Sequence, residues 1–491
     1  MSSKRSFLFK GIFGSVAVGP SLALLYGSIA WAHGDEVHGA ATKAAAPWWV
    51  WIGGLCVLTV VAYLVVHIGM RRSRGGELDG FSRNAKLLLI QSPFGGLTVS
   101  LIQLLFNLYL LALGFDLIFV AKFVAIQWTL HGLSVIPFGI LSDLFGRRRV
   151  YLWAYSGNIL STAVVLFTPD PSWLLLLAGI TGFFQGGHAI IGPPFMREQS
   201  RPHERVHLFS LTGGIRVGAA GFGNLAAGAL PFLYAGLFGI GPESAWALRA
   251  SLLTALPLMA CSMIPYYLIN EQWRPMDIRR WVKGIESIGP ISMLSFTELM
   301  VGIAMGFTTP FLNIYFLQHI HASTDQIGLV FAAASVLTAV VTIFVPFLVN
   351  RLGRVRTVTY VKLLGIPSLI LLGMTDSMFW AAIFYSFTIL MIGGPFPNRG
   401  IADPIFSLIA MDVVKERERG TTNGIMHASV EIPRGFGASL AGPFMAAGSW
   451  QVPFAIGGLV FAAAFIVYYL YFVRLDGRQA TVEGVAAAAI D

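Results

Sequence analysis

Apolar stretches of roughly 20 residues recur along almost the whole chain, and this recurrence limits the possible folds more than any other feature. A stretch of that length crosses a hydrocarbon core of ~30 Å as a helix. Only 12% of the residues are charged, whereas a soluble domain has about 25%. Because lipid offers no hydrogen bonds to the backbone, the spans must be helical. The sequence therefore predicts an all-α protein in a lipid bilayer.

Fourteen candidate spans follow one another with short polar connections. They lie at about 11–32, 47–69, 94–114, 117–141, 150–168, 173–195, 206–237, 244–268, 288–318, 327–349, 357–374, 377–409, 421–448 and 450–473.

The basic residues account for the net charge of +9 and also predict the topology. Lys and Arg gather in every second connection, as in Arg71-Arg72-Ser73-Arg74 and Arg147-Arg148-Arg149. Cytoplasmic connections collect such residues. We therefore expect a multi-pass protein of a bacterial-type inner (plasma) membrane with a cytoplasmic C-terminus. No basic face of a soluble domain is indicated, so nucleic acid is not an expected partner.

The N-terminal region has two interpretations. Residues 1–32 fit either a transmembrane helix or a cleaved signal peptide, since a basic start, an apolar stretch and Ala30-Trp31-Ala32 suit both. Residues 33–89 are predicted to contain a periplasmic His-rich segment, an extra transmembrane helix and a basic cytoplasmic linker.

An internal repeat divides the rest of the chain. The segment from Gly139 to Arg149 recurs 207 residues later as Pro346 to Arg356, with the Gly-Arg-x-Arg ending kept. A second match has an offset of 214 and pairs Glu204-Arg205 with Glu418-Arg419 and Gly221-Phe222-Gly223 with Gly435-Phe436-Gly437. Two related six-helix halves are predicted, and such repeats are typical of transporters that rock one bundle against the other.

The segment from Gly139 to Arg149 closely resembles motif A of the major facilitator superfamily, the loop between the second and third helices. The resemblance implies 12 core helices, a six-helix half at 90–270, a cytoplasmic linker at 271–287, a second half at 288–475 and a cytoplasmic tail at 476–491. One departure is Gly182, which stands where the proton-linked drug exporters of the superfamily carry Arg, so drug export is not favoured.

The resemblance also implies that the motif A loop is a conformational gate that steadies the outward-facing form. Asp143 and Arg147 are placed to pair with each other or with a helix terminus. The alternative is that these residues only cap helices and anchor the topology. The gate residues, including their counterparts in the second half, are Gly139, Asp143, Gly146, Arg147, Arg149, Asn350, Gly353 and Arg354.

Polar side chains within the spans are candidates for a substrate or proton cavity, because charge in a bilayer is expensive. They are Gln103, Asn107, His131, Gln185, His188, Arg216, Glu298, Asn313, Asn398, Arg399, Asp403, His427, Glu431 and Arg434. The charged ones can serve as anion anchors and proton carriers, or merely neutralise one another at helical spacing.

Prolines predict where helices break. Pro193 and Pro194 are expected to interrupt the fourth core helix, and Pro395, Pro397 and Pro404 the tenth. Broken helices expose carbonyl groups to a cavity, so the tenth helix is the first candidate for the substrate site.

Soft-metal ligands form a separate set. His33, Asp35 and His38 lie in the outer segment, and Met259, Cys261 and Met263 lie close together in the sixth core helix. Imidazoles and thioethers suit transition metals, although such residues also occur in solvated loops and apolar packing.

Three functions fit the sequence. The first is a secondary active transporter of a small solute or ion, coupled to protons and working by alternating access. The second is a copper-like metal importer of the same superfamily, and the third is a non-transporting scaffold or assembly partner that contacts another membrane protein through its N-terminal helices. No cofactor is expected, and no catalytic constellation indicates an enzyme. The chain lacks the Gly-x-x-x-x-Gly-Lys-Ser/Thr loop of nucleotide-driven pumps.

Overall fold

The computed structural model describes residues 81–201, 204–271, 286–342, 344–394, 400–415 and 418–488, with the side chains of 206 and 474–488 left out. The spans predicted at 11–32 and 47–69 lie outside these residues. The same is true of the candidate residues His33, Asp35, His38, Asn398 and Arg399.

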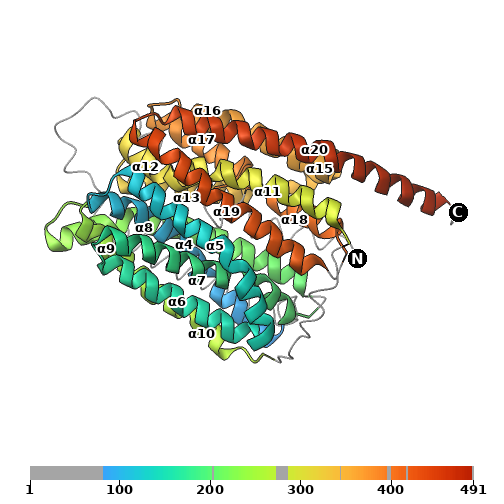
Figure 1. The fold of residues 1–491 in the computed structure, drawn as a ribbon, viewed down its shortest axis with the longest axis horizontal. Helices are drawn as coiled ribbons and strands as arrows, with labels where there is room; N and C mark the ends of the chain where they lie inside the picture. The colour runs from blue at the N-terminus through green and yellow to red at the C-terminus, as the bar shows by residue number, and fades with distance from the viewer. Residues whose placement is uncertain are drawn as a thin grey trace, which may run out of the picture.

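All regular elements of the described residues are helices. The first half consists of α4 (Arg83–Ala112), α5 (Leu117–Phe145), α6 (Arg147–Phe167), α7 (Pro171–Glu198), α8 (Arg205–Phe238), α9 (Ala245–Leu253) and α10 (Ala255–Leu268). These helices form the blue-to-green part of the bundle (Figure 1). Side chains of Ser82, Asp116, Asp170 and Ser244 accept hydrogen bonds from the first backbone N–H groups of the helices that follow, as N-cap residues do.

The second half forms the yellow-to-red part of the bundle, and α20 continues beyond it at the C-terminus (Figure 1). Its elements are α11 (Ile288–Thr308), η2 (Thr309–Phe311), α12 (Leu312–Ile314), η3 (Tyr315–His319), α13 (Thr324–Thr342), α14 (Val345–Leu352), α15 (Arg354–Leu364), α16 (Ile366–Leu372), α17 (Met378–Met391), α18 (Asp403–Asp412), α19 (Arg419–Ala446) and α20 (Gln451–Ala488).

Length and composition suit a membrane. Among the described residues, ten helical spans are long and apolar enough to cross a bilayer, and Met378–Met391 is a shorter apolar helix. Side chains such as Leu160, Leu237 and Leu459 are more than 60% exposed on the outside of the bundle. Exposed leucines at this density are expected where lipid is the solvent.

The expected break in the fourth core helix is wrong, whereas the tenth is interrupted. Helix α7 continues through Pro193 and Pro194 to Glu198. Membrane helices tolerate proline where neighbouring groups satisfy the freed carbonyls. The tenth span is divided between α17 and α18, with Gly393 and Gly400 at φ values of +100° and +81°. Glycine adopts this left-handed backbone without a Cβ clash, so the chain can turn there.

Hydrogen bonds reproduce the sequence repeat in three dimensions. The Tyr109 hydroxyl donates to the Leu166 carbonyl, and the Tyr315 hydroxyl donates to the Leu372 carbonyl. Glycine contacts repeat as well: a Cβ on Gly96 would lie 2.2 Å from the Arg216 carbonyl oxygen, and one on Gly302 would lie 2.2 Å from the Val430 carbonyl oxygen. The two halves therefore share their internal helix packing.

Buried carboxylates at one end of the bundle provide another repeated contact. Glu204 accepts hydrogen bonds from the backbone N–H and hydroxyl of Ser82, at 2.8 and 2.9 Å. Glu418 accepts from the N–H groups of Glu286 and Ser287, at 2.7 and 3.2 Å. Burial of Glu204 raises its pKa, but the hydrogen bonds from Arg201 and Ser82 outweigh this, and the pKa of Glu204 is lowered. The negative charge of Glu204 is thus retained beside the start of α4.

Glycines bring the two halves together at one end of the molecule. We call the end with the turns at Gly146 and Gly353 the basic end and the other the distal end. On the distal side, a Cβ on Gly435 of α19 would lie 2.5 Å from the Ala125 carbonyl oxygen of α5. A Cβ on Gly328 of α13 would lie 2.5 Å from the Asn224 carbonyl oxygen of α8. Small residues permit such close backbone approach.

Toward the basic end, the glycines of α8 make no such close contact. A Cβ on Gly213, Gly214 or Gly218 of α8 would have no heavy atom of another element within 4 Å. Polar contacts between the halves are again on the distal side: the Asn107 amide donates to the Pro310 carbonyl at 2.6 Å, and the Asn313 amide donates to the Leu104 carbonyl at 2.7 Å. Among the described residues, the closest backbone approaches between the halves therefore lie on the distal side and at the level of Gly132, and α8 has open space beside it toward the basic end.

Candidate transport site

A cavity of about 90 Å³ lies between the two halves. Four amide side chains line it, Gln103, Asn107, Gln127 and Gln185, and the first half provides most of the wall. The remaining lining residues are Ile102, Phe106, Phe123, Val124, Trp128, Thr162, Val165, Thr181, Thr309, Pro310 and Arg434. Amides and hydroxyls beside aromatic rings are suited to a small solute that both donates and accepts hydrogen bonds.

Arg434 supplies the charge at the edge of this cavity, and its guanidinium is held on three sides. It pairs with Glu431 at 3.3 Å and donates to the Thr309 hydroxyl at 3.0 Å. Its Cζ lies 4.1 Å from the centre of the Trp128 ring, in a cation–π contact. Arg434 and Glu431 are only 5% and 4% exposed. The neighbouring carboxylate therefore offsets the positive charge where it meets the cavity.

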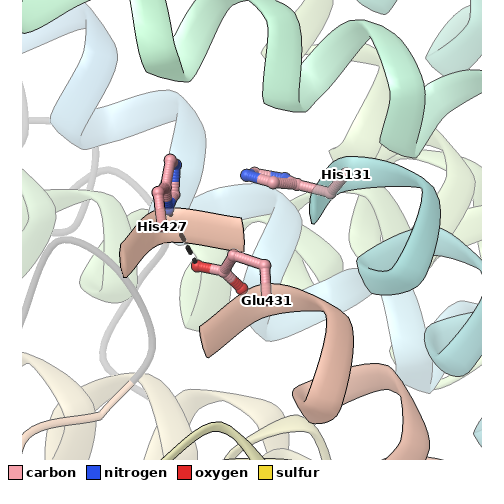
Figure 2. Close-up of side chains that lie close together, drawn as sticks. All are labelled: His131, His427 and Glu431. Atoms are coloured by element: carbon pink, nitrogen blue, oxygen red, sulfur yellow. Dashed lines mark ion pairs between the residues drawn. The ribbon is translucent and has the colours of Figure 1, made fainter. Parts of the chain in front are cut away.

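One helical turn further toward the basic end, two histidines meet from opposite halves. His131 belongs to α5, and His427 and Glu431 belong to α19 (Figure 2). The imidazole rings are 5.4 Å apart and nearly perpendicular, and His427 Nδ1 lies 3.9 Å from Glu431 Oε1. Gly132 permits this proximity, because a Cβ there would lie 2.9 Å from the Ile432 backbone nitrogen and 3.3 Å from Glu431 Cβ.

His188 and Arg216 lie in the first half and do not line this cavity. The His188 ring lies 4.9 Å from the Tyr155 ring and 3.5 Å from the Asn158 amide nitrogen. A Cβ on Gly95 would meet the Arg216 guanidinium at 3.2 Å. The two residues thus form part of a polar interior within one half.

Close packing of two helices accounts for Gly182, which stands where the drug exporters carry arginine. A Cβ at this position would lie 2.0 Å from the Gln127 carbonyl oxygen. Helices α5 and α7 therefore touch where an arginine would have to fit.

In the second half, Asp403 lies away from the cavity and pairs with a lysine that the sequence analysis overlooked. Lys362 Nζ is 2.8 Å from Asp403 Oδ1 and donates to the Ile392 carbonyl at 2.7 Å. Lys362 is only 4% exposed. Its ammonium binds a carbonyl freed by the break between α17 and α18, so the ion pair holds the interrupted helix together. A lone lysine within the span predicted at 357–374 was the signal that could have revealed it.

Removing this lysine is expected to destabilise the protein. Lys362→Met leaves Asp403 without its ammonium, and breaking one side of a buried pair costs about 3–5 kcal/mol. We expect a lower thermal unfolding temperature in detergent, with much of the loss recovered in Lys362→Met/Asp403→Asn. Lys122→Met, at an exposed lysine of α5, serves as the matched control. Equal unfolding temperatures for Lys362→Met and wild type would contradict this role.

Two further residues that the sequence analysis predicted for the cavity, Asn313 and Glu298, do not line it. Asn313 connects the halves through Leu104. Glu298 is half-buried on α11 and does not line the cavity. Trp128, Gln127 and Thr309 are contact residues that sequence reasoning missed, because aromatic, amide and hydroxyl groups are unremarkable in membrane helices until neighbours converge on them.

The predicted gate residues lie at two turns, one between α5 and α6 and one between α14 and α15. Arg147 pairs with Asp143 at 3.1 Å and with Glu198 at 2.7 Å, and Gly146 has a φ of +94°. In the second half Arg354 pairs with Asp412 at 2.8 Å and Gly353 has a φ of +81°. Gly139 has open space beside it, while Arg149 and Asn350 are exposed. Each turn is thus tied to the end of the fourth helix of its own half.

The predicted soft-metal residues of the sixth core span do not share one face of the helix. Met259 and Met263 are buried in an apolar cluster with Tyr151 and Ile190, whereas Cys261, between them, is partly exposed. A helix places residues two positions apart on different faces.

Comparison with known proteins shows which solved structures share this fold. A D-xylose-proton symporter has a TM-score of 0.61 at 15% identity, with 78% of this chain and 96% of that chain covered. The nucleoside transporter NupG has a TM-score of 0.57 at 14% identity, with 79% and 100% covered. The human organic anion transporter MFSD10 (TETRAN) has a TM-score of 0.50 at 16% identity, with 79% and 99% covered. The chain therefore shares the fold of these three transporters.

The second half also matches a family model. Residues 294–489 match the family model described as Major Facilitator Superfamily. This match covers less than half of the chain, and the fold similarity to transporters extends over 78–79% of it.

Proposed function

We propose that the protein is a secondary active transporter that moves a small, neutral, hydrogen-bonding solute by alternating access, driven by a proton gradient. The observation that carries this proposal is the amide-lined cavity between two halves whose closest described contacts lie toward one end. A site between two bundles becomes accessible to each side in turn when one bundle rocks against the other.

The basic end is the cytoplasmic side in this proposal, because Lys and Arg gather there. The described conformation is then closed outside and apart inside, which is the inward-facing form. The pair of Asp143 with Arg147 lies within the first half, in keeping with a gate that exchanges partners as the transporter changes state.

The wall of the cavity supports a neutral substrate. Arg434 is the charged residue that lines it, and Glu431 already offsets this charge. The amides can bind hydroxyl, carbonyl or amino groups, and Trp128 offers an apolar face. The D-xylose-proton symporter and the nucleoside transporter share the fold, which supports both a hydroxyl-bearing substrate and the proton as coupling ion. The absence of a nucleotide-binding loop from the sequence also favours an ion gradient as the energy source.

Proteoliposomes test this function directly. The purified protein is reconstituted, and uptake of labelled pentoses, polyols, nucleosides and monocarboxylates is measured with and without an imposed proton gradient. We expect gradient-dependent uptake of a neutral solute that a protonophore abolishes. Uptake that ignores the protonophore would contradict proton coupling, and uptake of carboxylates alone would contradict the neutral class. No uptake of any solute, with stable co-purification of another membrane protein, would favour the scaffold.

A further inference from the structure

Three metal-binding side chains converge where the two halves meet. One donor atom each from His131, His427 and Glu431 lies within 4.8 Å of the others, and Figure 2 shows the imidazoles and the carboxylate from α5 and α19 around a common point. We propose that these residues bind one divalent transition-metal ion of the Zn²⁺ class, which bridges the halves and arrests the transporter. This goes beyond the proposed function, because the ion is neither the solute nor the coupling ion.

The distances allow the site to form with small side-chain movements. Bonds of ~2.0–2.1 Å to nitrogen and oxygen in a tetrahedral site place the donor atoms about 3.4 Å apart. His427 Nδ1 and Glu431 Oε1 are already 3.9 Å apart. The two residues are four positions apart on one helix and the third donor comes from the facing helix, which is how metal sites are built between helices of a bundle.

The donor set selects the class of metal. Two imidazoles and one carboxylate suit Zn²⁺, Cu²⁺ and related ions, whereas Ca²⁺ and Mg²⁺ require oxygen donors. Three protein ligands leave a fourth position for water. A transition metal is therefore expected to bind, and Ca²⁺ or Mg²⁺ is not.

Arg434 acts as an outer partner of the site. Its guanidinium contacts Glu431 Oε2 at 3.3 Å, while Oε1 is the oxygen nearer His427. One carboxylate oxygen can therefore bind the metal while the other keeps its ion pair, which fixes the carboxylate as outer-shell partners do. The positive charge of Arg434 opposes that of the metal, so the site is expected to be weaker than a dedicated structural zinc site.

The bridge has a mechanical consequence. Opening the distal side requires α5 and α19 to separate, and the cluster lies beside their contact at Gly132 and Ile432. A metal bound to His131 on one helix and to His427 and Glu431 on the other resists this separation. The metal shifts the population toward the form that is closed on the distal side by as much as it binds that form more tightly than the other.

Zn²⁺ titration calorimetry of the purified full-length chain is the first test. His33→Ala/His38→Ala forms the background, because the outer segment contains further imidazoles. We expect one Zn²⁺ per chain, and binding at least tenfold weaker in His131→Ala and in His427→Ala, since even outer-shell changes typically cost 10–100-fold. His207→Ala, at an exposed histidine of α8, should bind as the background does. Equal affinity in all four proteins would overturn the site.

Two further measurements test the ligands and the arrest separately. Electron paramagnetic resonance of bound Cu²⁺ should show two nitrogen ligands in the background protein. The His427→Asn variant of that protein, in which Glu431 is unchanged, should show one. Identical spectra would overturn the ligand assignment. In proteoliposomes of the background protein, Zn²⁺ should slow solute exchange, and chelation should restore it. Zn²⁺ that accumulates inside the vesicles would overturn the arrest, because the ion would then be cargo.

Discussion

Glu431→Gln is expected to lower solute flux about 100-fold or more while the protein still reaches the membrane. The substitution removes a buried carboxylate that lies 3.3 Å from the Arg434 guanidinium. Breaking one side of a buried pair costs about 3–5 kcal/mol, which corresponds to a factor of about 100 or more in an equilibrium. Arg434 lines the cavity, so its uncompensated charge falls on the proposed substrate site. Flux is measured in proteoliposomes containing equal amounts of protein.

Two variants separate loss of charge balance from general damage. Glu431→Gln/Arg434→Gln removes both charges, and its thermal unfolding temperature should recover much of what the single variant loses. Glu243→Gln, at an exposed carboxylate between α8 and α9, should transport as the wild type does. Wild-type flux in Glu431→Gln would exclude Glu431 from the mechanism.

Gly435→Ala is expected to prevent the distal side from closing. Its new Cβ would lie 2.3 Å from the Thr129 hydroxyl and 2.5 Å from the Ala125 carbonyl oxygen, closer than real Cβ atoms approach. Because the Ala125 carbonyl belongs to the α5 backbone, α5 and α19 must move apart. We expect transport to be lost and the population to shift toward the form that is open on the distal side.

Labelling of a single cysteine measures this shift. Ala121→Cys is placed where α5 faces Gly442, in a chain with Cys56 and Cys261 replaced by Ala. A membrane-impermeant maleimide should label it faster in Gly435→Ala than in the parent. Gly236→Ala, with open space at the distal end of α8, should leave labelling unchanged. Equal labelling of Gly435→Ala and its parent would show that this contact does not control closure.

Much of the fold could be predicted from local patterns. The span predicted at 117–141 is α5 at Leu117–Phe145, and the span at 450–473 lies within α20 at Gln451–Ala488. One exception is Pro193-Pro194, where proline predicted a break and α7 continues. Proline removes one hydrogen-bond donor locally, but whether the helix bends or breaks depends on the neighbours that satisfy its carbonyls.

The candidate site was predictable only in part. The spacing of His427, Glu431 and Arg434 on one helix places them on one face, and the structure shows contacts along that face. Neither the approach of His131 to this face nor the pairing of Asp403 with Lys362 could be derived in the same way. Both depend on contacts between residues that lie far apart in the chain.

The sequence by itself determined an all-helical membrane protein with two related halves, because span length, charge placement and repeats are local properties set by the bilayer and by the chain. The tertiary structure decided which polar groups meet. Helices in lipid pack through shape and close backbone contact rather than through a contrast between apolar and polar faces. Their axial register, which glycines such as Gly132 and Gly435 permit, therefore brings His131 to Glu431 and places Trp128 over Arg434.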